Sequence, residues 1–293
     1  MDAGKTNHGQ KLYGRTMRHK LVELCSIGGT AFYFAMRFWL TKEFENFAFT
    51  DFLDNRKWFD IKLLTDATRS DHDHNKPMAN DTYAKAIKDV LGKLGLASNH
   101  WVHLGRTLGP KLLEVLEVEA EDIRILGNWD PKTQECSYST KLPMKAIRAS
   151  NGFFLAGGMH YNPRSVVDGP EFDRLKTKTP FAWAHHAVEF FQNRFAVEPA
   201  EGHYTAFQFC KFIAELNTVF LQDAAALLVK FPERSASAMF KMPVFQDPDW
   251  NVSIFRVCNI STIFTDASFC FYCYSLTWRS CANRWQLWRR PAH

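Results

Sequence analysis

Hydrophobic residues recur at helical spacing along much of the chain. From Ser26 to about Trp39, the side chains of Phe32, Ala35, Met36 and Trp39 share one helix face, and Ser26 is a suitable N-terminal cap. The same periodicity predicts helices over residues 81–94, 104–116, 121–126, 143–150, 181–195 and 204–231, and another that begins at Asp130-Pro131. The chain is therefore expected to be mainly α-helical.

The N-terminus carries a different pattern. Asn7-His8-Gly9 lies between two short extended runs in the stretch KTNHGQKLYG, and such a tripeptide is typical of a hairpin turn. We therefore expect a small N-terminal β-hairpin or sheet beside the helices.

Two changes in composition divide the chain. The stretch GFFLAGGMHYNPRSVVDGP, which begins at Gly152, is punctuated by Gly and Pro like a linker. After residue 250 the chain holds four of its seven Cys and three of its nine Trp without helical or strand periodicity, as a shifted reading frame or an unspliced intron would produce. The predicted parts are a core over 1–151, a helical extension over 152–250 and a poorly specified tail over 251–293.

Composition indicates a globular protein inside the cell. Of 293 residues, 46% are apolar and 23% charged, and no apolar run reaches the roughly 18 residues that a membrane span needs. The first residues lack the apolar core of a signal peptide, and the number of Cys is odd. We expect reduced thiols and no membrane association.

Positive charge is concentrated at the N-terminus. Lys5, Lys11, Arg15, Arg18 and Lys20 stand against one acid in the first twenty residues, whereas residues 151–250 carry 9 basic and 11 acidic residues. A basic strip on a balanced chain suits a polyanion such as DNA, although a solvated hairpin would have the same composition.

No cofactor or metal is expected. Cys270 and Cys273, with Cys258 and Cys281 nearby, have irregular spacing for a zinc site. The DHDH run and His185-His186 fit solvated or hydrogen-bonded side chains better than metal ligands.

Five residues fit the requirements of covalent DNA cleavage. Tyr138 is a candidate nucleophile, Arg106 a candidate bidentate phosphate ligand, and His103 and Trp129 candidate hydrogen-bond donors to the same phosphate. Lys5, on the expected hairpin, is a candidate general acid. His103 and Arg106 are three residues apart, Trp129 lies 26 residues after His103, and Tyr138 lies nine after Trp129. Each residue also has an ordinary role: the aromatic side chains in a core, and the charged ones in caps and surface ion pairs.

The order and spacing of these residues resemble the tyrosine recombinases. The stretches HLGRTLGP, IRILGNW, SYSTKLPMKAIR and VFLQDAAALL resemble more closely the recombinase-like domain of the fungal centromere-binding kinetochore subunit, which is shared with Crypton-type recombinases. The resemblance covers about residues 4–250. It implies a tyrosine-recombinase-like catalytic-domain fold followed by a helical extension, with Lys5, His103, Arg106, Trp129 and Tyr138 at the matching positions.

The resemblance also has a gap. The family places a first Arg upstream of the hairpin Lys, and only four residues precede Lys5. Arg15 and Arg18 follow it in the wrong order, and the N-terminal arm that closes around DNA has no match. We therefore expect the chain to be the C-terminal piece of a longer ancestor.

Three hypotheses follow. The first is a nuclear DNA-binding protein without cleavage activity, associated with the centromere by resemblance, in which Lys5, Lys11, Arg15, Arg18, Lys20 and Arg106 contact phosphates of double-stranded DNA. The second is an active Crypton-like recombinase that cuts DNA through Tyr138. The third is the product of a decayed gene. Whether the protein forms a homodimer is left open.

Overall fold

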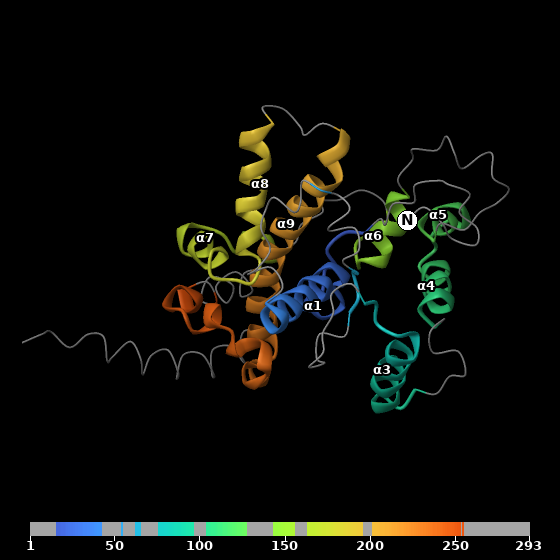
Figure 1. Ribbon diagram of the computed structural model, residues 1–293. Helices are drawn as coiled ribbons and strands as arrows, with labels where there is room; N and C mark the ends of the chain where they lie inside the picture. The colour runs from blue at the N-terminus through green and yellow to red at the C-terminus, as the bar shows by residue number, and fades with distance from the viewer. Residues whose placement is uncertain are drawn as a thin grey trace, which may run out of the picture. The chain divides into compact units, whose positions relative to one another are not determined.

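Helices account for most of the structure, a computed structural model that describes residues 16–42, 54, 62–65, 76–96, 104–127, 143–155, 163–195, 201–252 and 254. Of the interpretable part, 74% is helical. Figure 1 shows the α-helices α1 (Ser26–Thr41), α3 (Asn80–Lys93), α4 (Leu104–Val115), α5 (Ala120–Leu126), α6 (Met144–Ser150), α7 (Pro170–Lys176), α8 (Ala182–Arg194) and α9 (Glu201–Lys230). Short 3-10 helices are η1 (Val22–Leu24), η4 (Pro163–Val166), η5 (Pro232–Ala236), η6 (Ala238–Lys241) and η7 (Pro243–Gln246).

The prediction of a small N-terminal β-hairpin or sheet is wrong, because the described residues contain no strand. Residues 1–15, which carry the turn signal, lie outside the described residues. The signal was local: a turn tripeptide specifies a chain reversal, whereas a two-stranded hairpin without a third strand or a covering helix is marginally stable in water. The first described stretch, residues 16–25, is irregular apart from η1.

The helical predictions were largely confirmed. The ends of the predicted helices lie within three residues of the observed ones, a normal uncertainty for helix ends, whereas α7 was not predicted. In α1 the buried stripe is Ala31, Phe34, Ala35 and Phe38, one residue away from the predicted one. Aromatic residues surround this helix, so periodicity alone did not identify the more deeply buried side. The helix predicted to begin at Asp130 lies outside the described residues.

The chain forms two compact units. The first unit comprises residues 1–30 and 50–161, and the second comprises residues 31–49 and 162–293. The first turn of α1 is thus assigned to the first unit and its remainder to the second. Each unit is described below by itself.

The first unit has a small apolar core made by three short helices. Leu113 of α4, Ile123 of α5, and Ala146 and Ala149 of α6 pack with Val118, and Leu126 and Leu155 cover this cluster. Helix α3 has no buried residue, and Leu108, Leu112 and Val115 of α4 are exposed. The amphipathic helices of this unit therefore bury only a narrow part of their apolar surface.

Two backbone features shape α4. Pro110 lies within the helix and has no N–H to donate to the Arg106 carbonyl, four residues earlier. The helix ends at Val115. Glu117, two residues later, has a left-handed φ of 59°, and the N–H of Val118 then reaches back to the carbonyl of Leu113 at 3.0 Å. This closure turns the chain directly into α5.

The second unit is built around α9, along which α8 packs (Figure 1). A continuous series of aromatic contacts fills its interior. Phe38 contacts Phe181 at 5.7 Å between ring centroids, Phe181 contacts Phe220 at 5.7 Å, and Phe220 contacts Phe245 at 5.4 Å. Phe245 in turn contacts Trp250 at 4.7 Å in an edge-to-face arrangement. These rings connect α1, the start of α8, α9 and the segment after it into one core.

Buried polar side chains of α9 tie neighbouring segments to the same core. Asp223, fully buried, pairs with Arg164 of η4 at 2.7 Å, and Gln222 donates to the Val167 carbonyl at 3.0 Å. Part of the predicted linker is therefore packed in place. By length and composition α9 would pass as a membrane span, with a mean hydropathy of 1.5, but 56% of that window is buried. Together with its internally paired polar groups, this burial is characteristic of the central helix of a globular unit.

Candidate nucleic-acid interface

Arg106 lies in the first turn of α4 with its side chain exposed. It is seven residues before Leu113, and two helical turns place both on the same side of the helix. Leu113 is anchored in the core of the first unit, so the helix fixes the direction in which Arg106 extends. Lys111, also exposed, lies on a different face of the same helix because five residues correspond to about 140° of rotation.

The other four members of the predicted constellation lie outside the described residues. His103 immediately precedes α4, Trp129 comes two residues after Gly127 at the end of α5, and Tyr138 lies between α5 and α6. Lys5 lies in residues 1–15. The helices that flank His103, Trp129 and Tyr138 in sequence are thus the three that share the small core, but the structure does not test whether these side chains converge.

Two residues of the basic strip are described, and their segment is attached to the end of α6. The N–H of Lys20 donates to the Asn151 carbonyl at 2.9 Å, and the buried Asn151 side chain donates to the Ile147 carbonyl at 2.7 Å. The Lys20 side chain is exposed and that of Arg18 is half-buried. Lys11 and Arg15, like Lys5, fall outside the described residues.

The chain path beside this attachment depends on a glycine. Gly152 has a φ of +79°, and a Cβ added there would lie 3.2 Å from the His19 ring. The His19 Nδ1 accepts from the N–H of Leu21 at 2.9 Å, which turns the backbone toward η1. Backbone geometry, as well as side-chain packing, thus positions residues 18–20.

Several cations of the first unit are already paired. Lys145 contacts Glu119 at 2.5 Å, and this hydrogen bond raises the pKa of the Lys145 ammonium group. Arg124 pairs with Glu121, and Arg148 donates to the Phe154 carbonyl at 2.7 Å. To meet a phosphate, each of these side chains would have to give up or share an existing partner.

The sequence reasoning overlooked one basic surface. Lys85 and Lys88 of α3 are exposed and lie three residues apart, so they are neighbours on one helix face. Counting net charge missed them because Asp81 and Asp89 offset two of the three lysines of α3. The useful signal was the spacing of the lysines within a predicted helix, not the net charge of the segment.

No group of three His, Cys, Asp or Glu side chains able to hold a metal occurs among the described residues. His185 has a structural role: its Nε2 lies 3.1 Å from Nδ2 of the buried Asn217. Burial is the main reason that the pKa of His185 is lowered. Because the amide nitrogen donates, the ring nitrogen accepts, which fits a neutral His185.

Comparison with protein families identifies the family to which the chain belongs. Residues 1–251 match the family described as centromere DNA-binding protein complex CBF3 subunit, domain 2. The chain belongs to this family. The CBF3-subunit family match spans both units and ends just after Trp250, and it places the chain among centromere-associated DNA-binding proteins. No curated protein and no solved structure matches the chain.

Proposed function

We propose that this CBF3-family chain holds double-stranded DNA through its phosphates and does not cut it. The basic residues assigned to this role are Lys5, Lys11, Arg15, Arg18, Lys20 and Arg106. The observation that carries the proposal is the exposed Arg106 on a helix anchored by Leu113, in a chain whose family is defined by centromere DNA binding. Because chromosomal DNA is the ligand, the protein would be located in the nucleus. If it binds as a homodimer, two protein chains would be found on each DNA site.

Phosphate contacts have a measurable signature. Each phosphate neutralised releases counterions, so the logarithm of affinity falls with the logarithm of salt concentration with a slope of about −0.9 per contact. Arg106→Ala should weaken binding to all duplex sequences alike and reduce this slope by about one contact. Lys111→Ala, on another face of the same helix, is the matched control. Fluorescence anisotropy with two unrelated duplexes at several salt concentrations provides the measurement.

Two results would contradict this interface. One is an affinity that hardly changes between low and physiological salt. The other is an equal loss of affinity in Arg106→Ala and Lys111→Ala, since a general charge effect would then explain both.

We further propose that the fold is related to the tyrosine recombinases and that these 293 residues by themselves do not cut DNA. The His103-x-x-Arg106, Trp129 and Tyr138 spacing supports the relationship. Attack by the Tyr138 hydroxyl would place negative charge on two non-bridging phosphate oxygens, and in the related enzymes two Arg side chains share it. Only Arg106 matches in these 293 residues. Loss of one preorganised donor typically lowers the rate about 10²- to 10³-fold.

Covalent trapping separates this proposal from an active recombinase. The protein is incubated with nicked suicide substrates and analysed on a denaturing gel, with Tyr138→Phe as the control. We expect no protein–DNA adduct while salt-sensitive binding persists. An adduct that disappears in Tyr138→Phe would establish the recombinase activity instead.

A further inference from the structure

The second unit contains an open pocket of about 230 Å³ that the DNA-binding proposal does not use. Its lining comes from four segments that are distant in sequence. They are the C-terminal end of α1, the turn Lys178–Pro180 before α8, the first residues of α8, and Met242–Pro243 after η6. The pocket is therefore a product of the tertiary fold and not of one local motif.

The lining residues become more exposed from the base of the pocket to its opening. Phe38 and Met242 are 5% and 0% exposed and form its apolar base. Trp39 and Trp183 are half-buried, whereas Lys42 and Lys178 are exposed. The surface thus changes from aromatic and apolar at the bottom to cationic at the solvent edge.

Hydrogen bonds from α9 hold one wall in position. The Thr179 hydroxyl donates to Oδ1 of Asn217 at 2.8 Å, and Nδ2 of Asn217 donates to the Lys176 carbonyl at 2.9 Å. Asn217 is fully buried, so the turn before α8 has a rigid support.

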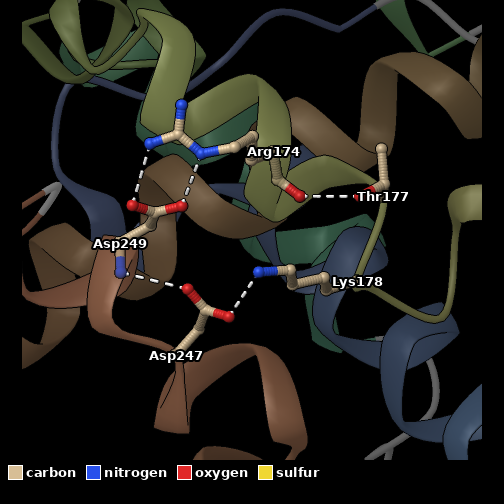
Figure 2. A network of polar contacts seen from close by, with 5 residues as sticks. All are labelled: Arg174, Thr177, Lys178, Asp247 and Asp249. Carbon is tan, nitrogen blue, oxygen red and sulfur yellow. Dashed lines mark hydrogen bonds and ion pairs between the residues drawn. The ribbon is translucent and has the colours of Figure 1, made fainter.

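Ion pairs attach the segment after η7 to α7 and to the same turn, as Figure 2 shows. Arg174 donates to both carboxylate oxygens of Asp249, at 2.8 and 3.0 Å. Lys178 contacts Asp247 at 2.5 Å, and the N–H of Asp249 donates to the Asp247 carboxylate at 3.0 Å. Lys178 therefore stands at the pocket edge in a fixed position, which reduces the entropy lost when a ligand binds.

Among the described side chains around the pocket, cations exceed anions by one. Lys42, Lys178 and Arg174 are cationic, and Asp247 and Asp249 are anionic. The Lys42 ammonium lies 4.5 Å from the centre of the Trp39 ring, so a positive charge and an aromatic face occur together at the opening. A nucleic-acid backbone needs a row of cations along its phosphates. One excess charge beside an apolar base favours a ligand with an apolar group and a nearby acid.

We propose that this pocket binds a short segment of a protein partner in which an aromatic side chain is flanked by acidic residues. A dry cavity of about 150 Å³ accommodates benzene, so this pocket has room for a phenyl ring and adjoining backbone. The ring would contact Phe38, Trp39 and Trp183, and the flanking carboxylates would approach Lys42 and Lys178. This site is independent of the DNA surface, so its failure would leave the proposed function untouched.

The test uses the full chain and three fluorescently labelled pentapeptides in an anisotropy titration. The sequences are Gly-Asp-Phe-Asp-Gly, Gly-Asp-Ser-Asp-Gly and Gly-Lys-Phe-Lys-Gly. We expect the first to bind at least about tenfold more tightly than the second, because the ring supplies the buried apolar surface. The third peptide should also bind more weakly than the first. Raised salt should reduce the difference in affinity between these two peptides, because it screens their charges.

Variants then place the binding. Lys42→Glu should weaken the Asp-Phe-Asp peptide severalfold, and Trp39→Ala more strongly. Lys241→Glu is the matched control, because Lys241 is exposed next to Met242 and does not line the pocket. If Trp39→Ala fails to fold, the comparison of peptide affinity between Lys42→Glu and Lys241→Glu still shows whether the peptide binds at the pocket.

Four outcomes would overturn the proposal. The first is no binding at millimolar peptide, and the second is equal affinity for all three peptides. The third is displacement of the peptide by oligothymidine, which would identify a nucleic-acid site. The fourth is binding that appears only after the chain is cut behind Ile254, which would show that residues 255–293 occupy the pocket.

Discussion

The two units of this CBF3-family chain use the same element, the α-helix, with different results. In the first unit, α4, α5 and α6 are 12, 7 and 7 residues long and share one small cluster of apolar side chains. In the second, α9 alone is 30 residues long, and the rings of Phe220 and Phe181 are completely buried. Short helices bury little surface each, so the first unit depends on tight chain reversals such as Glu117 and Gly152.

The difference indicates where stability and binding are located. The second unit has a self-sufficient core, and substitutions there should change the free energy of unfolding. The first unit carries Arg106, Arg18 and Lys20 on elements held by fewer contacts, so substitutions there should affect DNA binding first. The predictions below test this division, beginning with the largest effect.

Phe220→Ala should be the most damaging single change. The ring contacts Phe32 at 5.8 Å in addition to Phe181 and Phe245, and its removal leaves a cavity at the centre of the second unit. We expect a loss of about 4 kcal/mol in the free energy of unfolding. Phe212→Ala, on the same helix but 43% exposed, is the control and should cost much less. Urea denaturation measures both, and equal losses would mean that α9 is not buried as described.

Asp223→Ala should follow closely. It leaves Arg164 with an uncompensated charge at a site where the two side chains are 6% and 0% exposed. We expect a loss of about 3 kcal/mol. Replacement of both residues by apolar ones of similar size should recover most of it. If Asp223→Ala were as stable as the original protein, water would have to reach the Arg164–Asp223 pair.

Ile123→Ala tests the weaker unit. Ile123 is 5% exposed within the small core, so its truncation should cost about 2 kcal/mol and disturb α4 and α6 together. Duplex affinity should fall although Ile123 is not charged. Hydrogen exchange should show protection lost in the first unit and retained along α9. Equal loss of protection in α9 would mean that the two units unfold together.

Asp249→Asn should have the smallest effect. Hydrogen bonds from Arg174 hold the pKa of the Asp249 carboxyl group below its ordinary value of 3.8. The unfolded chain therefore takes up this proton at higher pH than the folded one. The contribution to stability is present above about 3.8 and is lost as the pH falls through the lowered pKa. The melting temperatures of variant and original should differ slightly at pH 7 and converge in acid. A difference that persists in acid would assign the effect to packing.

The sequence predicted most of the helices because their apolar spacing is strong. The match to residues 1–251 confirmed the resemblance to the centromere-binding subunit, and the relation to recombinases stays a prediction. The sequence failed at the hairpin, where a three-residue turn signal carried the whole prediction. It could not predict the Arg164–Asp223 pair either, because the two residues are 59 positions apart and neither has a local signature. Of the candidate site, only Arg106, Arg18 and Lys20 have described positions. The convergence of Lys5, His103, Trp129 and Tyr138 remains a prediction, because all four lie outside the described residues.

The contact between Gly152 and His19 also restricts how this sequence can diverge. Any side chain at position 152 would adopt an unfavourable left-handed backbone and meet the imidazole ring at 3.2 Å. The two positions should therefore change together among related sequences: a residue other than Gly at 152 requires a smaller one at 19. Position 19 lies between Arg18 and Lys20. A substitution at position 152, just after α6, would therefore be accompanied by a change inside the basic strip.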